Sequence, residues 1–220
     1  MGKLALGYGS EWHLLRYLGR YRSVLDEHVR ATTGANRVRW LDWNSSPTEA
    51  DAEWKGISFL PTDTRARIAE AWVDWWPQRG NPHNWDAVAS LDEKEWLLVE
   101  AKAHLDELDS SCTAVGEGRD RIDRACAATR VALEATGTNW LTRYYQMANR
   151  LAFLQFLSQQ GVAARLLFIY FVGDRRTGGV VAPQTEEGWL PALEAQDLHL
   201  GLRPEHPLRD RIHKLFLRVA

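Results

Sequence analysis

The chain contains few cysteines and lysines and has no long apolar run. Only two cysteines and five lysines occur among its 220 residues. Cys112 and Cys126 are too few for a disulfide framework or a four-cysteine zinc site. No apolar stretch approaches the roughly 18 residues that a membrane helix needs, and residues 1–10 are too polar for a signal peptide. We therefore expect a cytoplasmic protein with reduced cysteines and no membrane association.

Several common catalytic motifs are also missing. The sequence has no HExxH zinc signature, no P-loop, no GxGxxG motif and no nucleophile elbow. A serine or cysteine nucleophile therefore has no support. The formal net charge of −2 excludes a molecule that is basic over its whole surface, although it allows a local basic face.

Length, composition and periodicity indicate one α/β domain covering residues 1–220. Apolar residues make up 45% and charged residues 25% of the chain, as in ordinary globular proteins. Hydrophobic spacing predicts helices over 10–32, 64–76, 117–135, 139–160 and 188–197. Alternating or continuous apolar runs predict strands over 37–43, 84–89, 95–104, 164–172 and 213–219. This order predicts a central mixed sheet flanked by helices, with an insertion at about 44–82.

One strand carries a carboxylate and a lysine beside an apolar face. Because side chains alternate along a strand, Glu100 and Lys102 share one face of strand 95–104. If the preceding strand pairs with this strand through a hairpin, Asp86 comes close to Glu100. Two converging carboxylates suit a hard cation such as Mg²⁺ or Mn²⁺. Lys102 could then orient or help to deprotonate an attacking water, or stabilise charge that develops on a phosphoryl group.

The acid-x-Lys spacing is a weak signal by itself. It occurs three times in the chain, whereas random placement would give roughly 0.7 occurrences. Only Glu100-Ala101-Lys102 follows an apolar strand and has an aspartate on the strand before it. The simplest competing interpretation is an exposed ion pair at a sheet edge.

With these residues, the sequence resembles the PD-(D/E)XK, or restriction-endonuclease-like, nuclease superfamily, and in particular a bacterial branch of it. The family core runs helix, three strands, helix, strand, with an acid on the second strand and acid-x-Lys on the third. Asp86 and Glu100-Ala101-Lys102 match these positions, and the resemblance covers about residues 10–172. Trp85 stands where the family usually has proline. The resemblance implies a restriction-endonuclease-like α/β fold and a metal-dependent nuclease that hydrolyses phosphodiester bonds, with DNA as the favoured substrate.

The resemblance adds two candidate site residues. Many members carry an acid on the first helix, and Glu11 fits this position as a further catalytic carboxylate and metal ligand. The helix dipole explains a carboxylate there equally well. Gln146 matches a polar group on the helix after the acid-x-Lys strand, with helix capping, core hydrogen bonding or solvent exposure as alternatives. For His83 and His104, a structural role is the simpler interpretation.

Three functional interpretations stay open. The leading one is a nuclease in which Asp86, Glu100 and Glu11 bind Mg²⁺ or Mn²⁺ and Lys102 and Gln146 assist. The alternative is a catalytically silent nuclease-fold module for binding or assembly. Retention of all three residues speaks against loss of catalysis, while the mild net acidity speaks against tight nucleic-acid binding. The third is an unrelated α/β protein with a structural ion pair, which predicts that Asp86 and Glu100 lie far apart. The expected partner is nucleic acid, and a homodimer is allowed.

Overall fold

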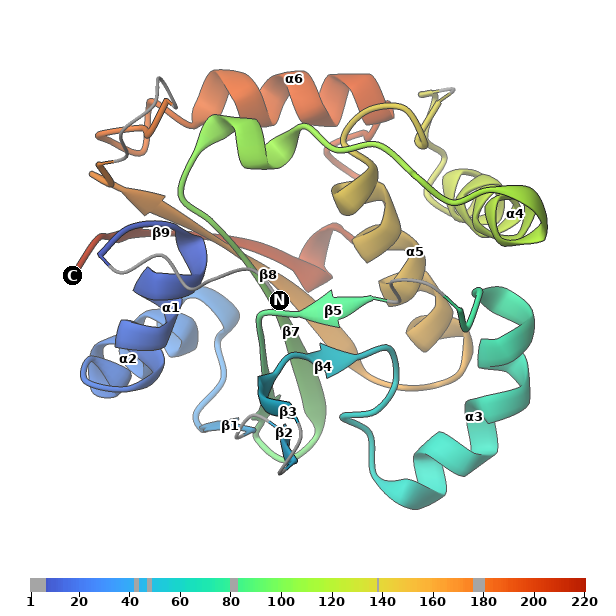
Figure 1. Cartoon of the computed structure of the whole chain (residues 1–220), viewed down its shortest axis with the longest axis horizontal. Helices are drawn as coiled ribbons and strands as arrows, with labels where there is room; N and C mark the ends of the chain where they lie inside the picture. Colours follow the sequence, from blue (N-terminus) through green and yellow to red (C-terminus); the bar gives the residue numbers. More distant parts are fainter. Residues whose placement is uncertain (1–6, 42–43, 47–48, 80–82, 138, 176–180) are drawn as a thin grey trace.

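A five-stranded mixed sheet forms the centre of the computed structural model, which describes residues 7–41, 44–46, 49–79, 83–137, 139–175 and 181–220 (Figure 1). The strand order is β1-β6-β7-β8-β9. These strands span Val38–Trp40, Ala87–Leu91, Glu95–Lys102, Ala164–Val172 and Ile212–Arg218. The β1, β6 and β7 strands pair antiparallel, whereas β7, β8 and β9 pair parallel. The predicted central mixed sheet is therefore confirmed.

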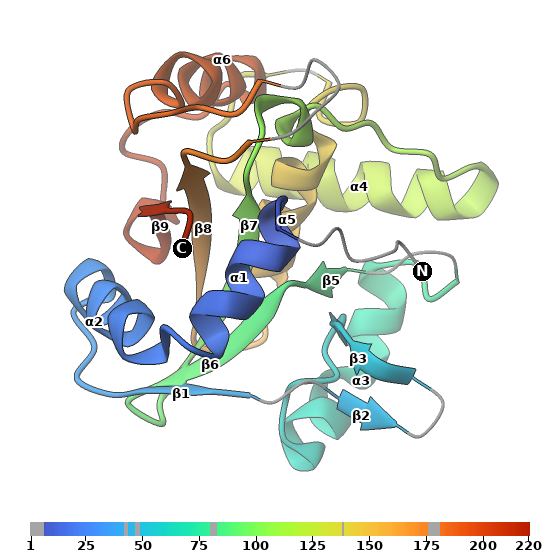
Figure 2. The ribbon, with the colours of Figure 1, turned by 60° about the vertical axis from the view of Figure 1, so that its left-hand side comes forward.

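Helices cover both faces of this sheet (Figures 1 and 2). On one face lie α1 and α2, which span Ser10–Leu18 and Arg22–Thr33. On the other face lies α5 (Tyr145–Gln159). Its hydrophobic core also includes residues of α3 (Thr62–Trp75), α4 (Gly116–Ala132) and α6 (Leu190–Leu200). No helix of the described chain is long and apolar enough to cross a membrane.

Short elements complete the description. A hairpin is formed by β2 (Asn44–Ser46) and β3 (Glu49–Ala52). Next to it, β4 (Trp54–Lys55) pairs with β5 (Asn84–Trp85), which directly precedes β6. A 3₁₀ turn, Leu105–Leu108, follows β7, and a second 3₁₀ turn, Arg209–Arg211, directly precedes β9.

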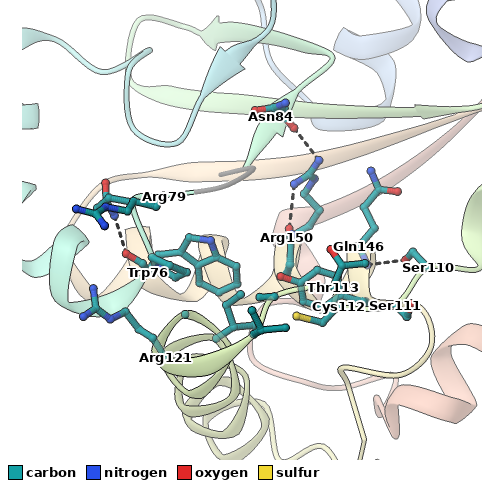
Figure 3. A pocket seen from close by; sticks show the side chains of 18 of the residues that line it. Trp76, Arg79, Asn84, Ser110, Ser111, Cys112, Thr113, Arg121, Gln146 and Arg150 are labelled. Atoms are coloured by element: carbon teal, nitrogen blue, oxygen red, sulfur yellow. Dashed lines mark hydrogen bonds between the residues drawn. The ribbon is translucent and has the colours of Figure 1, made fainter. Parts of the chain in front are cut away.

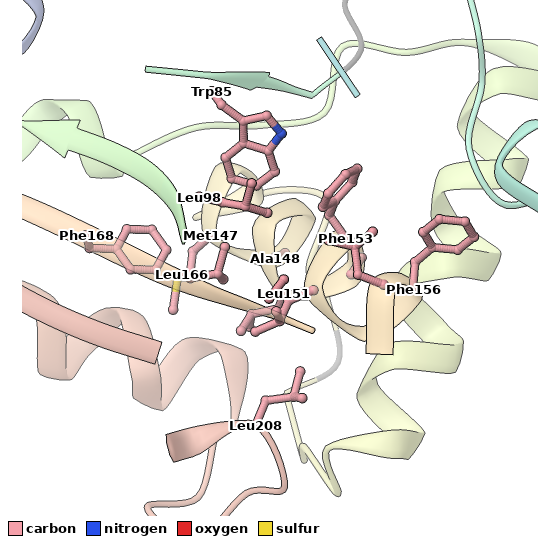
Figure 4. Packing of buried hydrophobic residues seen from close by; sticks show 14 of the residues in the cluster. Trp85, Leu98, Met147, Ala148, Leu151, Phe153, Phe156, Leu166, Phe168 and Leu208 are labelled. Atoms are coloured by element: carbon pink, nitrogen blue, oxygen red, sulfur yellow. The ribbon is translucent and has the colours of Figure 1, made fainter. Parts of the chain in front are cut away.

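The side chains of β7 divide between two hydrophobic cores, as strand alternation requires. Leu97, Val99 and Ala101 pack with α1 and α2, whereas Leu98 belongs to the core on the α5 side. Figure 4 shows Leu98 facing residues of α5, among them Leu151. Both faces of the sheet are thus covered, which explains why the neighbouring strand β8 is a continuous apolar run.

The strand predicted over 37–43 ends at Trp40, and residues 42–43 lie outside the described residues. Three larger differences from the predicted elements concern helices and a strand. The helix predicted over 10–32 is two helices, because the chain turns at Gly19 and α2 packs against α1. The helix predicted over 139–160 begins only at Tyr145, since Tyr144 adopts a left-handed conformation with φ 53°. The strand predicted over 84–89 bends at Asp86, so that β5 and β6 pair with different strands.

Candidate functional site

Glu100 and Lys102 lie on β7 and form a buried ion pair on the α5 side of the sheet. Lys102 Nζ contacts Glu100 Oε1. Glu100 is 3% exposed and Lys102 is 8% exposed, and β7 lies between β6 and β8. The interpretation of this pair as an exposed ion pair at a sheet edge is therefore wrong. Burial of two charged groups requires compensating partners.

Asp86 reaches the same place from the bend between β5 and β6. Its Oδ2 atom accepts a hydrogen bond from the backbone N–H of Ala101 at 2.7 Å, and its own N–H donates to the carbonyl of Val99 at 3.2 Å. These bonds hold the Asp86 carboxyl beside Glu100. The large separation of Asp86 and Glu100 that the third interpretation predicts is therefore not observed.

Two residues of α5 complete the surroundings of Glu100. Gln146 Nε2 donates to Oε1 at 2.7 Å, while the Nε and NH2 groups of Arg150 donate to Oε2 at 2.9 and 2.7 Å. Together with Lys102 these donors fill the roughly four acceptor positions of a carboxylate. The predicted position of Gln146 next to the acid-x-Lys strand is thus observed, and its bond to Glu100 is a partly buried hydrogen bond.

Arg150 is the site residue that the sequence prediction missed. Its guanidinium also donates to the carbonyl of Asn84 at 2.6 Å and lies 4.5 Å from the ring centre of Trp85. Trp85 is fully buried, so this cation–π contact is desolvated and favourable. The available signal was spacing: Arg150 follows Gln146 by four residues and therefore lies on the same face of α5.

The three ionisable groups of this cluster differ in the direction in which their surroundings shift the pKa. Burial opposes ionisation of Glu100, but the positive charges of Arg150 and Lys102 outweigh it and lower the Glu100 pKa. Burial likewise opposes the charge of Lys102, but Glu100 and Asp86 outweigh it and raise the Lys102 pKa. For Asp86, burial and the Glu100 charge raise the pKa to about 8. At neutral pH the cluster therefore contains a charged Glu100 and Lys102 and a largely protonated Asp86.

A cavity of about 1140 Å³ opens in front of Asp86, Gln146 and Arg150 (Figure 3). Its walls are the end of α3 and the following turn, the 110–115 loop and the first turns of α4 and α5. Glu100 and Lys102 do not line this cavity and instead border a gap of only about 10 Å³. Within the cluster, Asp86, Gln146 and Arg150 are therefore the residues that face the cavity.

Glu11 lies near this region, but its predicted role stays a prediction. Its side chain is exposed on the first turn of α1, and its pKa is raised by partial burial and by the charge of Glu53. Glu53, which was not predicted as a site residue, lines the cavity. The charges that shift the pKa of Asp86 come instead from Glu100, Lys102 and Arg150.

The two histidines considered in the sequence occupy structural positions. His104 is buried, with Nδ1 at 2.8 Å from Glu107 and Nε2 at 3.1 Å from Asp174. The other oxygen of Asp174 lies 3.1 Å from His13 Nε2, so this cluster joins α1 to the ends of β7 and β8. His83 is also buried, and its Nε2 donates to the carbonyl of Asn149 at 3.0 Å.

Of the two carboxylates, Asp86 is better placed than Glu100 to bind a hard cation. Asp86 is partly exposed at the cavity wall, and proximity to a second carboxylate disfavours its ionisation, which a divalent cation would reverse. Glu100 would have to exchange at least one of its present donors. Within the described ranges, no three His, Cys, Asp or Glu side chains form a ready cluster for a metal ion.

Comparisons with known proteins give no further guide to this site. No protein-family model, curated protein or solved structure matches the chain.

Proposed function

We propose that the protein is a metal-dependent nuclease of the restriction-endonuclease-like type that hydrolyses phosphodiester bonds in nucleic acid, with DNA as the favoured substrate. The observation that carries this proposal is the convergence of Asp86, Glu100 and Lys102, with Asp86 in the wall of a cavity. The order of elements supports it, because the sheet is built from a helical pair, three antiparallel strands, two helices and a parallel strand, an order similar to the core that the sequence resembles.

Mg²⁺ or Mn²⁺ is the proposed cofactor, held by Asp86 and Glu100 with Glu11 as a further candidate ligand. When bound, such an ion supplies Lewis-acid stabilisation of a phosphoryl oxygen. Of Asp86 and Glu100, only Asp86 lines the cavity, and the hydrogen bond that its carboxyl accepts from the Ala101 backbone N–H fixes its orientation.

The remaining catalytic and positioning roles are assigned to other side chains of the protein. Lys102 stays protonated because its pKa is raised, so it stabilises negative charge on the phosphoryl group and orients water rather than removing a proton. Gln146 and Arg150 hold the two oxygens of Glu100 in place. Trp85 and the Asn84 carbonyl in turn hold Arg150. The proposed catalytic set is therefore Asp86, Glu100, Lys102, Glu11 and Gln146, with Arg150 as a positioning residue.

An oligonucleotide cleavage assay with Mg²⁺ or Mn²⁺ tests this proposal. We expect cleavage by the wild type and its loss in Glu100→Ala and Lys102→Ala. Lys94 is the matched control, because it is the lysine of another acid-x-Lys triplet and is exposed in the β6–β7 turn. Lys94→Ala should cleave like the wild type. Equal activity in all four proteins would refute the assignment.

A catalytically silent binding module is the second candidate, and the saturation of Glu100 favours it. Lys102, Gln146 and Arg150 already occupy both Glu100 oxygens. A module of this kind predicts nucleic-acid binding without metal-dependent cleavage by the wild-type protein.

Location and assembly are further parts of the proposal. Cys112 and Cys126 are free and buried, which fits the reducing cytoplasm. A homodimer stays a prediction that size-exclusion chromatography with light scattering would test.

A further inference from the structure

Access to the proposed catalytic residues runs through the cavity in front of α5. Glu100 and Lys102 are buried, while Asp86 and Gln146 are partly exposed and line the cavity. Glu100 and Lys102 do not line the cavity; they line a gap of only about 10 Å³, with Phe168 among its walls. A phosphodiester therefore meets this cluster at Asp86 and Gln146, by entering the cavity.

The shape of the cavity suits an unpaired strand. Its volume of about 1140 Å³ exceeds the roughly 300–1,000 Å³ that pockets for single small ligands occupy. The cavity therefore has room for a short segment of a single strand. A double helix is far larger, since its major groove alone is about 12 Å wide. The backbone of a single strand can bend into such a space, whereas a paired strand is held on its partner.

The lining of the cavity also has the chemistry that single strands require. Sites for single-stranded nucleic acid combine positive charges along the backbone with aromatic rings on which bases stack. Arg79 and Arg121 line the cavity, and Figure 3 shows them on the side away from Gln146. Tyr145 is partly exposed and lines it as well.

The cavity is also lined by an amide side chain and by two carboxylates. Asn149 lines the cavity, and its Oδ1 accepts a hydrogen bond from Arg150 at 2.9 Å; side-chain amides of this kind can exchange such bonds for the edges of unpaired bases. Glu53 and Glu117 line the cavity too and partly balance the arginines. Binding should therefore depend on stacking and hydrogen bonding as well as on charge.

We propose that this cavity binds single-stranded DNA, with an unpaired nucleotide adjacent to the reacting phosphodiester. The inference rests on the proposed nuclease function and narrows its substrate to single strands or single-stranded tails.

Fluorescence anisotropy with Ca²⁺ tests the binding. The probes are a labelled oligonucleotide of mixed sequence and its blunt duplex. We expect the single strand to bind about tenfold more tightly, which corresponds to one stacked base at about 1.4 kcal/mol. Arg79→Ala and Arg121→Ala should each weaken single-strand binding several-fold. Arg124→Ala is the matched control, because Arg124 is exposed on α4 and is not part of the cavity lining.

Equal or tighter binding of the duplex would overturn the inference, as would an equal loss of affinity in Arg124→Ala. Cleavage of the same probes with Mg²⁺ separates this result from the nuclease proposal. Preferential cleavage of the duplex, lost in Lys102→Ala, would refute the single-strand inference and leave the nuclease function standing. Tight single-strand binding without cleavage would refute the nuclease function and support the binding site.

Discussion

Asp86→Asn should make the metal-free protein more stable at neutral and alkaline pH. The pKa of Asp86 is raised from 3.8 to about 8 by burial and by the charge of Glu100. Between these two values the folded protein keeps the Asp86 proton and the unfolded chain loses it, so the stability of the wild type falls as pH rises. Asparagine removes this penalty and keeps an oxygen that can accept the Ala101 N–H.

The size of the effect follows from the displaced pKa. About four pH units at about 1.4 kcal/mol per unit set an upper bound of about 6 kcal/mol. Asp86 is partly exposed at the cavity, so we expect a gain of about 2–4 kcal/mol at pH 8 after screening by solvent.

Urea unfolding in EDTA from pH 5 to 9 measures this gain. The difference between Asp86→Asn and the wild type should grow up to about pH 8 and then level off. Asp92→Asn is the control, because the Asp92 pKa is lowered by hydrogen bonds from the backbone N–H groups of Asn36 and Arg37. Its difference from the wild type should be flat over this range. A flat difference for Asp86→Asn as well would refute the electrostatic reasoning.

Three further predictions concern stability. Arg150→Met leaves a buried carboxylate with fewer partners and should cost about 3 kcal/mol in urea unfolding; no loss would contradict the account. Gly201→Ala places a methyl group 2.0 Å from the backbone nitrogen of Gly137 and should lower the thermal midpoint. Gly161→Ala is the control, because φ is also positive there but no atom lies within 4 Å, and its thermal midpoint should fall far less. Asp174→Ala removes the carboxylate between two buried histidines and should cost about 2–3 kcal/mol, whereas an unchanged midpoint would show that the cluster is dispensable.

The central sheet could be predicted because its signals are local. The apolar run of β8 and the alternation of β7 determine which residues point to each core. The break at Gly19 and the late start of α5 could not be predicted in the same way, because the apolar spacing continues across both places. Tertiary packing of α2 against α1 decides the first, and the left-handed Tyr144 marks the second.

The candidate site was predictable only in part. The proximity of Asp86 to Glu100 could be predicted because it follows from strand alternation and hairpin pairing, which depend on short-range geometry. The role of Arg150 depends on how α5 is rotated against β7, and helical spacing alone does not give that rotation. Glu53 lies in the segment predicted as an insertion, so its position on the cavity wall follows from tertiary packing alone.

Calorimetric titration with Mg²⁺ at pH 8 measures whether Asp86 and Glu100 form the proposed cation site. We expect binding by the wild type that is lost in Asp86→Asn and Glu100→Gln and retained in Asp92→Asn. Absence of binding by the wild type, or binding that survives both substitutions, would refute the proposed cation site.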